Sequence, residues 1–375
     1  MQCQLDEPLK LAGPFEIPCR KRALAQGLQM VDSKPAWWVR TIRLIGWIVL
    51  WCFILFAALW CAFALYYSNL PALLRPWVAA LLVAASIAAL FFLKPRRRGI
   101  GAFLALLTIV LVYWLMIPPS NTRHWRKDVS VLPWTEVEGN KATIHNIRNS
   151  DYRTTTDFDL HYYDRMYDLD QLRSLDFFMC FWAPIPFCHT MLSFGFENGD
   201  FLCVSIETRP EEHEVFDPVA ACFKQFELVY VAGDERDLVW LRTNLRDEAV
   251  YLYRIDTTRD AMRRIFLRYC ARMNELKARP EWYCTFTRNC TTDIPRKDGR
   301  DRGLLPESWK VLINGFVDEL LYRQGSLDRS MPLPELRKIG HINTRAQNAD
   351  SDPEFSRLIR VGIPEIQPAA TARKQ

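Results

Sequence analysis

The chain has 375 residues, of which 50% are hydrophobic and 24% are charged, so it is long enough for two or three folded units and is not a disordered polymer. The formal net charge is +5, but no Lys/Arg stripe with interleaved aromatic residues is present, which argues against a nucleic-acid binder. Between residues 44 and 118 the charged residues are confined to two short loops, whereas residues 119–375 have the composition of a soluble domain. The composition therefore predicts that residues 44–118 lie in a membrane.

Three apolar stretches are long enough to cross a bilayer as helices, which takes about 20 residues. Leu44–Tyr67 has 24 residues without a charge, Gly99–Ile117 has 19, and Trp77–Leu93 has 17. The shortest stretch can be extended at its front if Arg75 reaches the headgroups. A signal peptide does not fit, because the first apolar run begins after residue 43 and is too long. We therefore predict three retained transmembrane helices.

The positions of Lys and Arg predict how these helices are oriented, because cytoplasmic flanks carry the excess of both residues. Residues 1–43 contain seven, the loop Lys94–Arg98 contains four, and the loop between the first two spans contains only Arg75. The N-terminus and the Lys94–Arg98 loop are expected in the cytoplasm, and everything after Ile117 outside it. Met1 and Met30 both fit as the first residue. The predicted parts are a cytoplasmic tail (1–43), a membrane domain (44–118), an external domain (119–364) and a flexible tail (365–375).

Strand patterns dominate the first half of the external domain. His189–Phe196 and Phe201–Glu207 flank the pair Asn198-Gly199, which is a strong signal for a β-hairpin. Further strands are predicted at Phe226–Val231, Leu238–Thr243 and Val250–Ile255. Together these segments predict a mainly antiparallel sheet.

Two helices are predicted after the strands. Thr257 or Thr258 caps the first, which ends near Pro280 and has one apolar face made of Met262, Ile265, Phe266, Tyr269, Met273 and Leu276. The second runs from about Pro306 to Arg323. Strands followed by helices, without alternation of strand and helix, predict an α+β fold.

Seven of the 11 cysteines lie in the external domain: Cys180, Cys188, Cys203, Cys222, Cys270, Cys284 and Cys290. An odd number in an oxidising compartment leaves at least one thiol unpaired within the chain, and the spacing alone leaves the pairing open. No C-x-x-C or H-E-x-x-H motif is present and the six histidines are scattered, so neither a metal nor a cofactor is predicted.

Two short segments contain residues suited to nucleophilic catalysis, CHTMLSFGF (Cys188–Phe196) and RNCTT (Arg288–Thr292). A thiol is nucleophilic as the thiolate, which a neighbouring imidazole and the N-terminus of a helix stabilise. Asn289 is a good N-cap that would place Cys290 in the first turn of a short helix, whose N–H groups could hold an oxyanion. His189 would be the base. The pattern alone favours the alternative of a structural His189 and a buried or disulfide-bonded Cys290.

Several segments resemble the Lnb N-terminal periplasmic domain family, in order between Tyr162 and Pro364: His189–Arg209, Phe226–Asn244, Val250–Arg254, Pro280–Thr292 and Glu354–Arg360. That family is marked by a His and an Asn-Cys-Thr motif, which His189 and Asn289-Cys290-Thr291 match. It is similar to permuted papain-like (NlpC-like) cysteine enzymes, in which the His precedes the Cys. The resemblance implies such a domain in the periplasm, anchored in a bacterial inner membrane. Cys284 departs from the family, which usually has Asn there.

A third group should orient the imidazole, and Ser205 and Glu207 are the candidates on the following strand. A strict two-residue turn at Asn198-Gly199 turns Glu207 to the opposite face from His189, so Glu207 requires a bulge or a longer loop. The charged run Glu235, Arg236 and Asp237 also belongs to the resemblance. Its residues are expected to form a turn with an ion pair at a strand end.

The family's named member is a lipoprotein N-acyltransferase, so the resemblance implies a Cys/His acyltransferase that takes an acyl chain from a phospholipid through a thioester. Its partners would be membrane lipids and lipoproteins. Two alternatives remain open: an anchored thiol peptidase or amidase that acts on cell-envelope peptides, and a non-catalytic envelope scaffold. The oligomeric state has no signal in the sequence.

Overall fold

The computed structural model of the chain describes residues 37–182, 186–294, 304–306 and 308–366. Two compact units are distinguished, Met1–Ala57 and Ala58–Gln375. The predicted N-terminal tail before residue 37, with the alternative start at Met30, and the predicted flexible tail after residue 366 lie outside the described residues.

Three long apolar helices form the N-terminal part of the described chain: α2 (Trp37–Tyr66), α3 (Arg75–Phe92) and α4 (Arg96–Met116). Each is long and apolar enough to cross a membrane, which confirms that the three predicted stretches are helical. The helix α2 begins before the predicted Leu44 and includes the basic residues Arg40 and Arg43. Many large apolar side chains of these helices are exposed, as expected for surfaces that contact lipid.

The domain that follows is built on one eight-stranded mixed sheet. Its strands are β1 (Trp134–Glu138), β2 (Lys141–Tyr152), β3 (Phe158–Asp168), β4 (Leu172–Phe181), β5 (His189–Phe196), β6 (Phe201–Arg209), β7 (Glu227–Gly233) and β8 (Ala249–Arg254). The order is β1-β2-β7-β6-β5-β4-β8, and β3 pairs with β2. All pairs are antiparallel except β2 with β7, which meet at Arg148 and Gly233. The α+β class and the mainly antiparallel sheet are confirmed.

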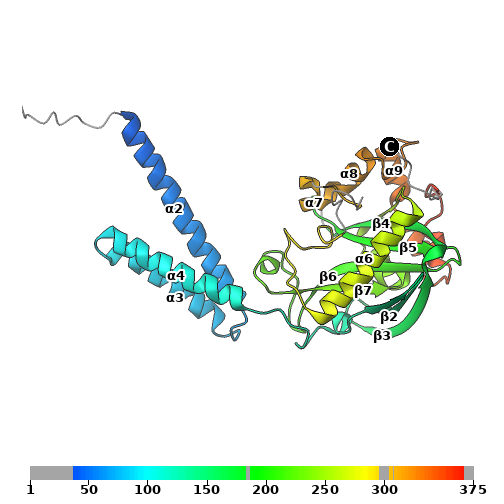
Figure 1. Cartoon of the computed structure of the whole chain (residues 1–375), viewed down its shortest axis with the longest axis horizontal. Coiled ribbons are helices and arrows are strands. Elements are labelled where there is room, and N and C mark those ends of the chain that lie inside the picture. The colour runs from blue at the N-terminus through cyan, green and yellow to red at the C-terminus, as the bar shows by residue number, and fades with distance from the viewer. Residues whose placement is uncertain (1–36, 183–185, 295–303, 307, 367–375) are drawn as a thin grey trace, which may run out of the picture. The chain divides into compact units, whose positions relative to one another are not determined.

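One face of the sheet is covered by α6 (Arg259–Ala278), which lies across the strands in Figure 1. The Thr258 hydroxyl accepts the N–H of Ala261 and caps this helix, as predicted. The six residues of its predicted apolar face are all buried. Phe266 packs edge-on against Phe194 of the central strand β5, and such aromatic pairs fix the helix on the sheet.

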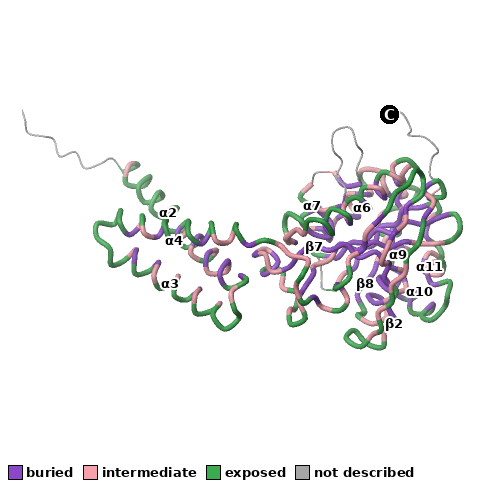
Figure 2. The backbone as a smooth tube through the Cα atoms, turned by 60° about the horizontal axis from the view of Figure 1, so that its bottom comes forward, coloured by how far each residue is buried: buried purple, intermediate pink, exposed green. Residues whose placement is uncertain are grey.

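The opposite face is covered by short helices: α5 (Glu235–Leu238), α10 (Asn343–Asn348) and α11 (Phe355–Leu358). The helix α9 (Leu333–Gly340) packs against the edge strand β8, where Gly340 lies close to Leu252 and Tyr253. Apolar residues of these helices and of the strands form a second core cluster that includes Met191, Leu238, Ile342 and Phe355. Figure 2 shows the buried backbone concentrated in the sheet between the two helical layers. Glu235 accepts a hydrogen bond from the Ser193 hydroxyl and forms an ion pair with Arg360, and Asp237 forms an ion pair with Arg148. The charged run therefore has the structural role that was predicted.

Two predicted elements differ in the structure. Leu238–Thr243 is not a strand: it continues from α5 into a π-helical turn, η4 (Leu241–Leu245). A six-residue apolar run fits strand and helix equally well, and here Leu238 and Val239 pack on the sheet as a helical turn. The predicted helix near Pro306–Arg323 is divided into α7 (Trp309–Leu312), η5 (Asn314–Phe316) and α8 (Val317–Arg323). The remaining single turns are η1 (Lys127–Val129), η2 (Leu169–Gln171) and η3 (Ala220–Cys222).

Candidate active site

The hairpin of β5 and β6 decides which residues share a face with His189. Met191 pairs with Ser205 and Gly195 with Phe201, so continuing this register places His189 opposite Glu207. The strands are joined by the four residues 197–200, and Phe196 N–H donates to Asp200 O at 3.0 Å. The two-residue turn considered from the sequence is therefore wrong. The longer loop brings Ser205 and Glu207 to the face on which His189 lies.

The imidazole of His189 is held at Nε2. This nitrogen lies 2.7 Å from Ser205 Oγ and 3.2 Å from Glu207 Oε1. The Ser205 hydroxyl donates to the same carboxylate oxygen at 2.6 Å. Because Ser205 donates to Glu207, Nε2–H donates to Ser205, and the ring is oriented through a side-chain relay.

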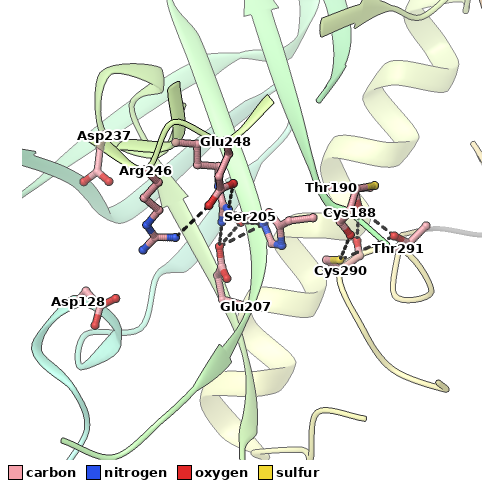
Figure 3. A network of polar contacts seen from close by, with 12 residues as sticks. Asp128, Cys188, Thr190, Ser205, Glu207, Asp237, Arg246, Glu248, Cys290 and Thr291 are labelled. Atoms are coloured by element: carbon pink, nitrogen blue, oxygen red, sulfur yellow. Dashed lines mark hydrogen bonds and ion pairs between the residues drawn. The ribbon is translucent and has the colours of Figure 1, made fainter. Parts of the chain in front are cut away.

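Glu207 is itself anchored by a buried arginine. Arg242 donates to Glu207 Oε1 at 2.9 Å and to Glu248 Oε2 at 2.9 Å. Arg242 is 6% exposed and comes from η4, the segment that was predicted as a strand. In Figure 3, Glu207, Ser205 and Glu248 gather on one side of the site, and Cys188, Thr190, Cys290 and Thr291 on the other. This network gives the imidazole a fixed, negatively charged neighbour.

Cys290 lies in a turn that Asn289 caps. Asn289 Oδ1 accepts the N–H groups of Thr291 and Thr292, each at 2.8 Å, and Asp293 N–H donates to Asn289 O at 3.1 Å. The cap matches the prediction, but in the described residues the segment makes a single turn rather than a helix. The Asn289 amide also donates to Thr285 O at 2.5 Å, so its polar atoms are all used to hold the turn. Asn289 therefore has the geometry of a positioning residue.

The sulfur of Cys290 is nearly enclosed by polar groups. Its Sγ lies 3.9 Å from Cys188 O, 3.8 Å from Thr291 Oγ1 and 3.7 Å from Asn314 Nδ2. The Thr190 hydroxyl, next to His189 in the chain, donates to Cys290 O at 3.0 Å. Cys290 is 5% exposed and His189 is 8% exposed. A reaction at this sulfur would proceed with little access for water.

Cys290 and His189 meet, although they are a hundred positions apart in the chain. Burial raises the pKa of the Cys290 thiol, but the charge of His189 and a hydrogen bond with it, aided by Thr190 and Thr291, bring the pKa below its ordinary value. Since Nε2 is engaged by Ser205 and Glu207, Nδ1 is the ring nitrogen left to exchange a proton with the sulfur. The arrangement favours a thiolate beside an imidazolium.

The pKa values of His189 and Glu207 also favour a protonated imidazole beside an ionised carboxylate. Burial and Arg242 lower the pKa of His189, but Glu207 and Cys290 outweigh them and raise it to about 9. Burial raises the pKa of Glu207, yet the charges of His189 and Arg242 hold it well below its ordinary value. Glu207 is therefore ionised near neutral pH, where His189 is protonated, and it stabilises the imidazolium.

Two residues of the site were not identified from the sequence. Asn314 in η5 donates to Cys188 O at 2.6 Å and to Thr291 Oγ1 at 2.8 Å, and it accepts Cys188 N–H at 2.9 Å. It thereby joins the backbone before His189 to the turn of Cys290. An Asn-Gly pair within a predicted helix was the available signal. For Arg242 the available signal was a single charged residue within the otherwise mainly apolar run 238–243.

The described residues contain no group of three or more His, Cys, Asp or Glu side chains that could hold a metal ion. The groups that can react at Cys290 are its own sulfur, the imidazole of His189 and the carboxylate of Glu207. That chemistry is nucleophilic attack by sulfur with proton transfer through His189.

The segment that carries most of these residues also matches a known domain family. Residues 159–296 match the Lnb N-terminal periplasmic domain family. The match confirms the resemblance and, with the three apolar helices, identifies a membrane-associated protein with a periplasmic domain. No curated protein and no solved structure matches the chain.

The Lnb N-terminal periplasmic domain match is shorter than the resemblance drawn from the sequence, which extended to Pro364. It includes His189, Ser205, Glu207 and Cys290. Asn314 and the helices α7 to α11 lie beyond residue 296. The part of the chain after the matched domain therefore contributes a direct contact to the site.

Proposed function

We propose that the protein is a periplasmic, membrane-anchored cysteine acyltransferase whose domain has the permuted papain-like arrangement, with His189 before Cys290. The observation that carries the proposal is the convergence of Cys290 and His189: the Thr190 hydroxyl, next to His189 in the chain, donates to Cys290 O, and Nε2 of the imidazole is held by Ser205 and Glu207. The charge of His189 lowers the pKa of the Cys290 thiol. This is the constellation of nucleophile, base and orienting group that thiol-dependent acyl transfer requires. A structural cysteine needs neither a lowered pKa nor an oriented imidazole.

The acyl-transfer chemistry follows from the assigned groups. The Cys290 thiolate attacks an ester carbonyl of a phospholipid, and the tetrahedral intermediate collapses to a thioester when the His189 imidazolium gives its proton to the leaving alkoxide. The neutral imidazole then takes a proton from the attacking amine of the acceptor, and the thiolate leaves. In this scheme the oxyanion is held by the N–H of Cys290, since Asn289 occupies the N–H groups of Thr291 and Thr292.

Contacts near the end of α4 support a lipid as the acyl donor. Lys224 Nζ donates to Trp114 O at 2.7 Å and to Ile117 O at 3.3 Å. Trp282, eight positions before Cys290, donates to Ile117 O at 3.4 Å. The segment that leads to the nucleophile therefore contacts the C-terminal end of an apolar helix. A lipid donor and a lipid-anchored acceptor would be present there at high effective concentration.

The proposed topology follows from the same helices and from the basic flanks. The three apolar helices span the inner membrane of a bacterium, with residues 1–43 in the cytoplasm and residues 119–364 in the periplasm. Phospholipids would be the donors and lipoproteins with a free α-amine the acceptors. These assignments rest on the count of Lys and Arg beside each helix and on the periplasmic domain match.

The decisive experiment is incubation of the full-length protein, in mixed micelles, with a phospholipid radiolabelled in its acyl chains. We expect the peptide Asn289–Arg296 to carry label that hydroxylamine removes, as it does from a thioester. We also expect the label to be transferred to a synthetic lipopeptide with a free N-terminal amine. Cys290→Ala and His189→Ala should abolish both signals. Cys270→Ala, which removes a buried thiol elsewhere in the domain, should retain them.

Other outcomes would contradict acyl transfer in distinct ways. Release of free fatty acid at the same rate with and without lipopeptide indicates a lipase. Cleavage of envelope peptides without label on Cys290 indicates the thiol peptidase or amidase. Full complementation of a deletion strain by Cys290→Ala indicates the non-catalytic scaffold.

A further inference from the structure

Two cysteines outside the candidate site lie against each other. Cys222 ends the turn η3, and Cys284 precedes the turn of Cys290 by a few residues. Each of the two thiols shifts the pKa of the other, which is raised at Cys222 and lowered at Cys284. Both segments also meet at one carbonyl: Cys222 Sγ lies 3.4 Å from Pro218 O, and the Thr285 hydroxyl donates to the same oxygen at 2.9 Å. The two thiols are therefore neighbours that the surrounding backbone holds in place.

Exposure distinguishes this pair from the other described cysteines of the periplasmic domain. Cys222 and Cys284 are partly exposed, whereas the others are buried: Cys180, Cys188, Cys203, Cys270 and Cys290. A disulfide forms by exchange with an external disulfide, which requires access. The pair thus combines proximity with accessibility in a compartment that favours oxidation.

We propose that Cys222 and Cys284 form a disulfide bond in the mature protein, which joins the segment before β7 to the segment that presents Cys290. This pairing uses two of the seven cysteines of the external domain and leaves the thiol of Cys290 free. It does not rest on the proposed acyl transfer.

The chemistry is an exchange with an oxidised dithiol oxidoreductase. The hydrogen bond from Cys222 lowers the pKa of Cys284, with help from the N–H groups of Phe286 and Thr287, so Cys284 is the thiolate that attacks. One sulfur of the oxidoreductase leaves and a mixed disulfide with Cys284 forms. Cys222 loses its proton to solvent and attacks Cys284 Sγ, and the second oxidoreductase sulfur leaves. Two protein thiols have then lost two electrons and two protons, and the oxidoreductase is reduced to its dithiol.

The position of Cys284 predicts what the bond does. Cys284 N–H donates to Arg288 O at 2.9 Å and Arg288 N–H donates to Cys284 O at 3.0 Å, which closes the loop between them. Within that loop Thr285 O accepts the amide of Asn289, the cap of the Cys290 turn. A covalent tie at Cys284 therefore restrains the base of the loop that holds the nucleophile.

Peptide mapping of the full-length protein, purified from membranes after acid quenching and alkylation of free thiols, tests the pairing. Trypsin with Glu-specific protease separates the three relevant cysteines into Val215–Lys224, Trp282–Arg288 and Asn289–Arg296. We expect the first two peptides to be linked, with a mass two hydrogens below the sum, and to separate on reduction. Asn289–Arg296 should be alkylated without reduction.

Variants provide the matched comparison. Cys284→Ser should make Cys222 alkylable, Cys222→Ser should do the same for Cys284, and Cys270→Ser should leave the linked peptides unchanged. Alkylation of both Cys222 and Cys284 in the unmodified protein without prior reduction would overturn the proposal. A link from either of them to Cys290 would overturn it as well. Failure of acyl transfer, in contrast, leaves the linked peptides in place.

Discussion

Removing the charge of Glu207 is the sharpest test of how the site forms its thiolate. In Glu207→Gln the amide keeps the shape of the side chain but removes the carboxylate that lies 3.2 Å from His189 Nε2. The carboxylate stabilises the imidazolium, so its loss lowers the pKa of His189 from about 9. A less protonated imidazole stabilises the Cys290 thiolate less, so the pKa of Cys290 rises. The pH range in which thiolate and imidazolium coexist therefore narrows from both ends.

The size of the effect can be estimated from the geometry. Two unit charges about 4 Å apart interact by about 4 kcal/mol at an effective dielectric constant of about 20. Because the Glu207 side chain is 27% exposed, we expect screening to reduce this to about 2 kcal/mol. At about 1.4 kcal/mol for a factor of ten, the ratio of ion pair to neutral pair falls about 30-fold.

The assay is the rate of carboxamidomethylation of Cys290 by iodoacetamide, measured across about pH 5–10 from the mass of Asn289–Arg296. In the unmodified protein the rate should rise with a midpoint below the ordinary value for a thiol, and in Glu207→Gln this midpoint should move upward. The control is Glu235→Gln, which also breaks a buried ion pair of the domain, but whose partners are Arg360 and Ser193 rather than His189. If the midpoint of Glu207→Gln coincides with that of the unmodified protein, Glu207 does not support the imidazolium. Equal shifts in both variants would instead indicate general damage to the fold.

Three further outcomes are expected. The rate of acyl transfer should depend on pH as a bell, rising through the lowered pKa of Cys290 and falling above about 9, where His189 loses the proton that the leaving group needs; a rate that stays high beyond that limit would exclude His189 as the acid. Asn314→Ala removes the side chain that bonds the buried N–H and C=O of Cys188, at a cost of about 1–3 kcal/mol for each group, and should slow the alkylation of Cys290. Asn314→Asp can still accept the N–H of Cys188 and should restore part of the rate. Equal alkylation rates in the unmodified protein and both variants would show that Asn314 does not support the site. Phe266→Ala should lower the free energy of unfolding by about 3–5 kcal/mol in urea titrations, because the ring is fully buried between α6 and β5, and a change below about 1 kcal/mol would contradict that packing.

Patterns local in the chain were sufficient for much of the architecture. The three apolar helices, the helix capped by Thr258 and the strands β5, β6, β7 and β8 follow from hydrophobic periodicity and from capping and turn residues, which act over a few positions. The strands β2 and β3 gave no such signal, because many of their side chains are polar or exposed. His189, Asn289 and Cys290 were selected by residue type and by their place in a known family's motif.

Tertiary structure decided which of these residues act together. The four-residue loop after β5 sets the register that turns Glu207 toward His189, and a two-residue turn would have pointed it away. Arg242 and Asn314 reach the site from segments whose local patterns predicted a strand and an unbroken helix. The adjacency of Cys222 and Cys284 likewise comes from chain segments about sixty positions apart. Contacts between distant segments depend on the packing of the whole sheet, so short-range sequence patterns carry no information about them.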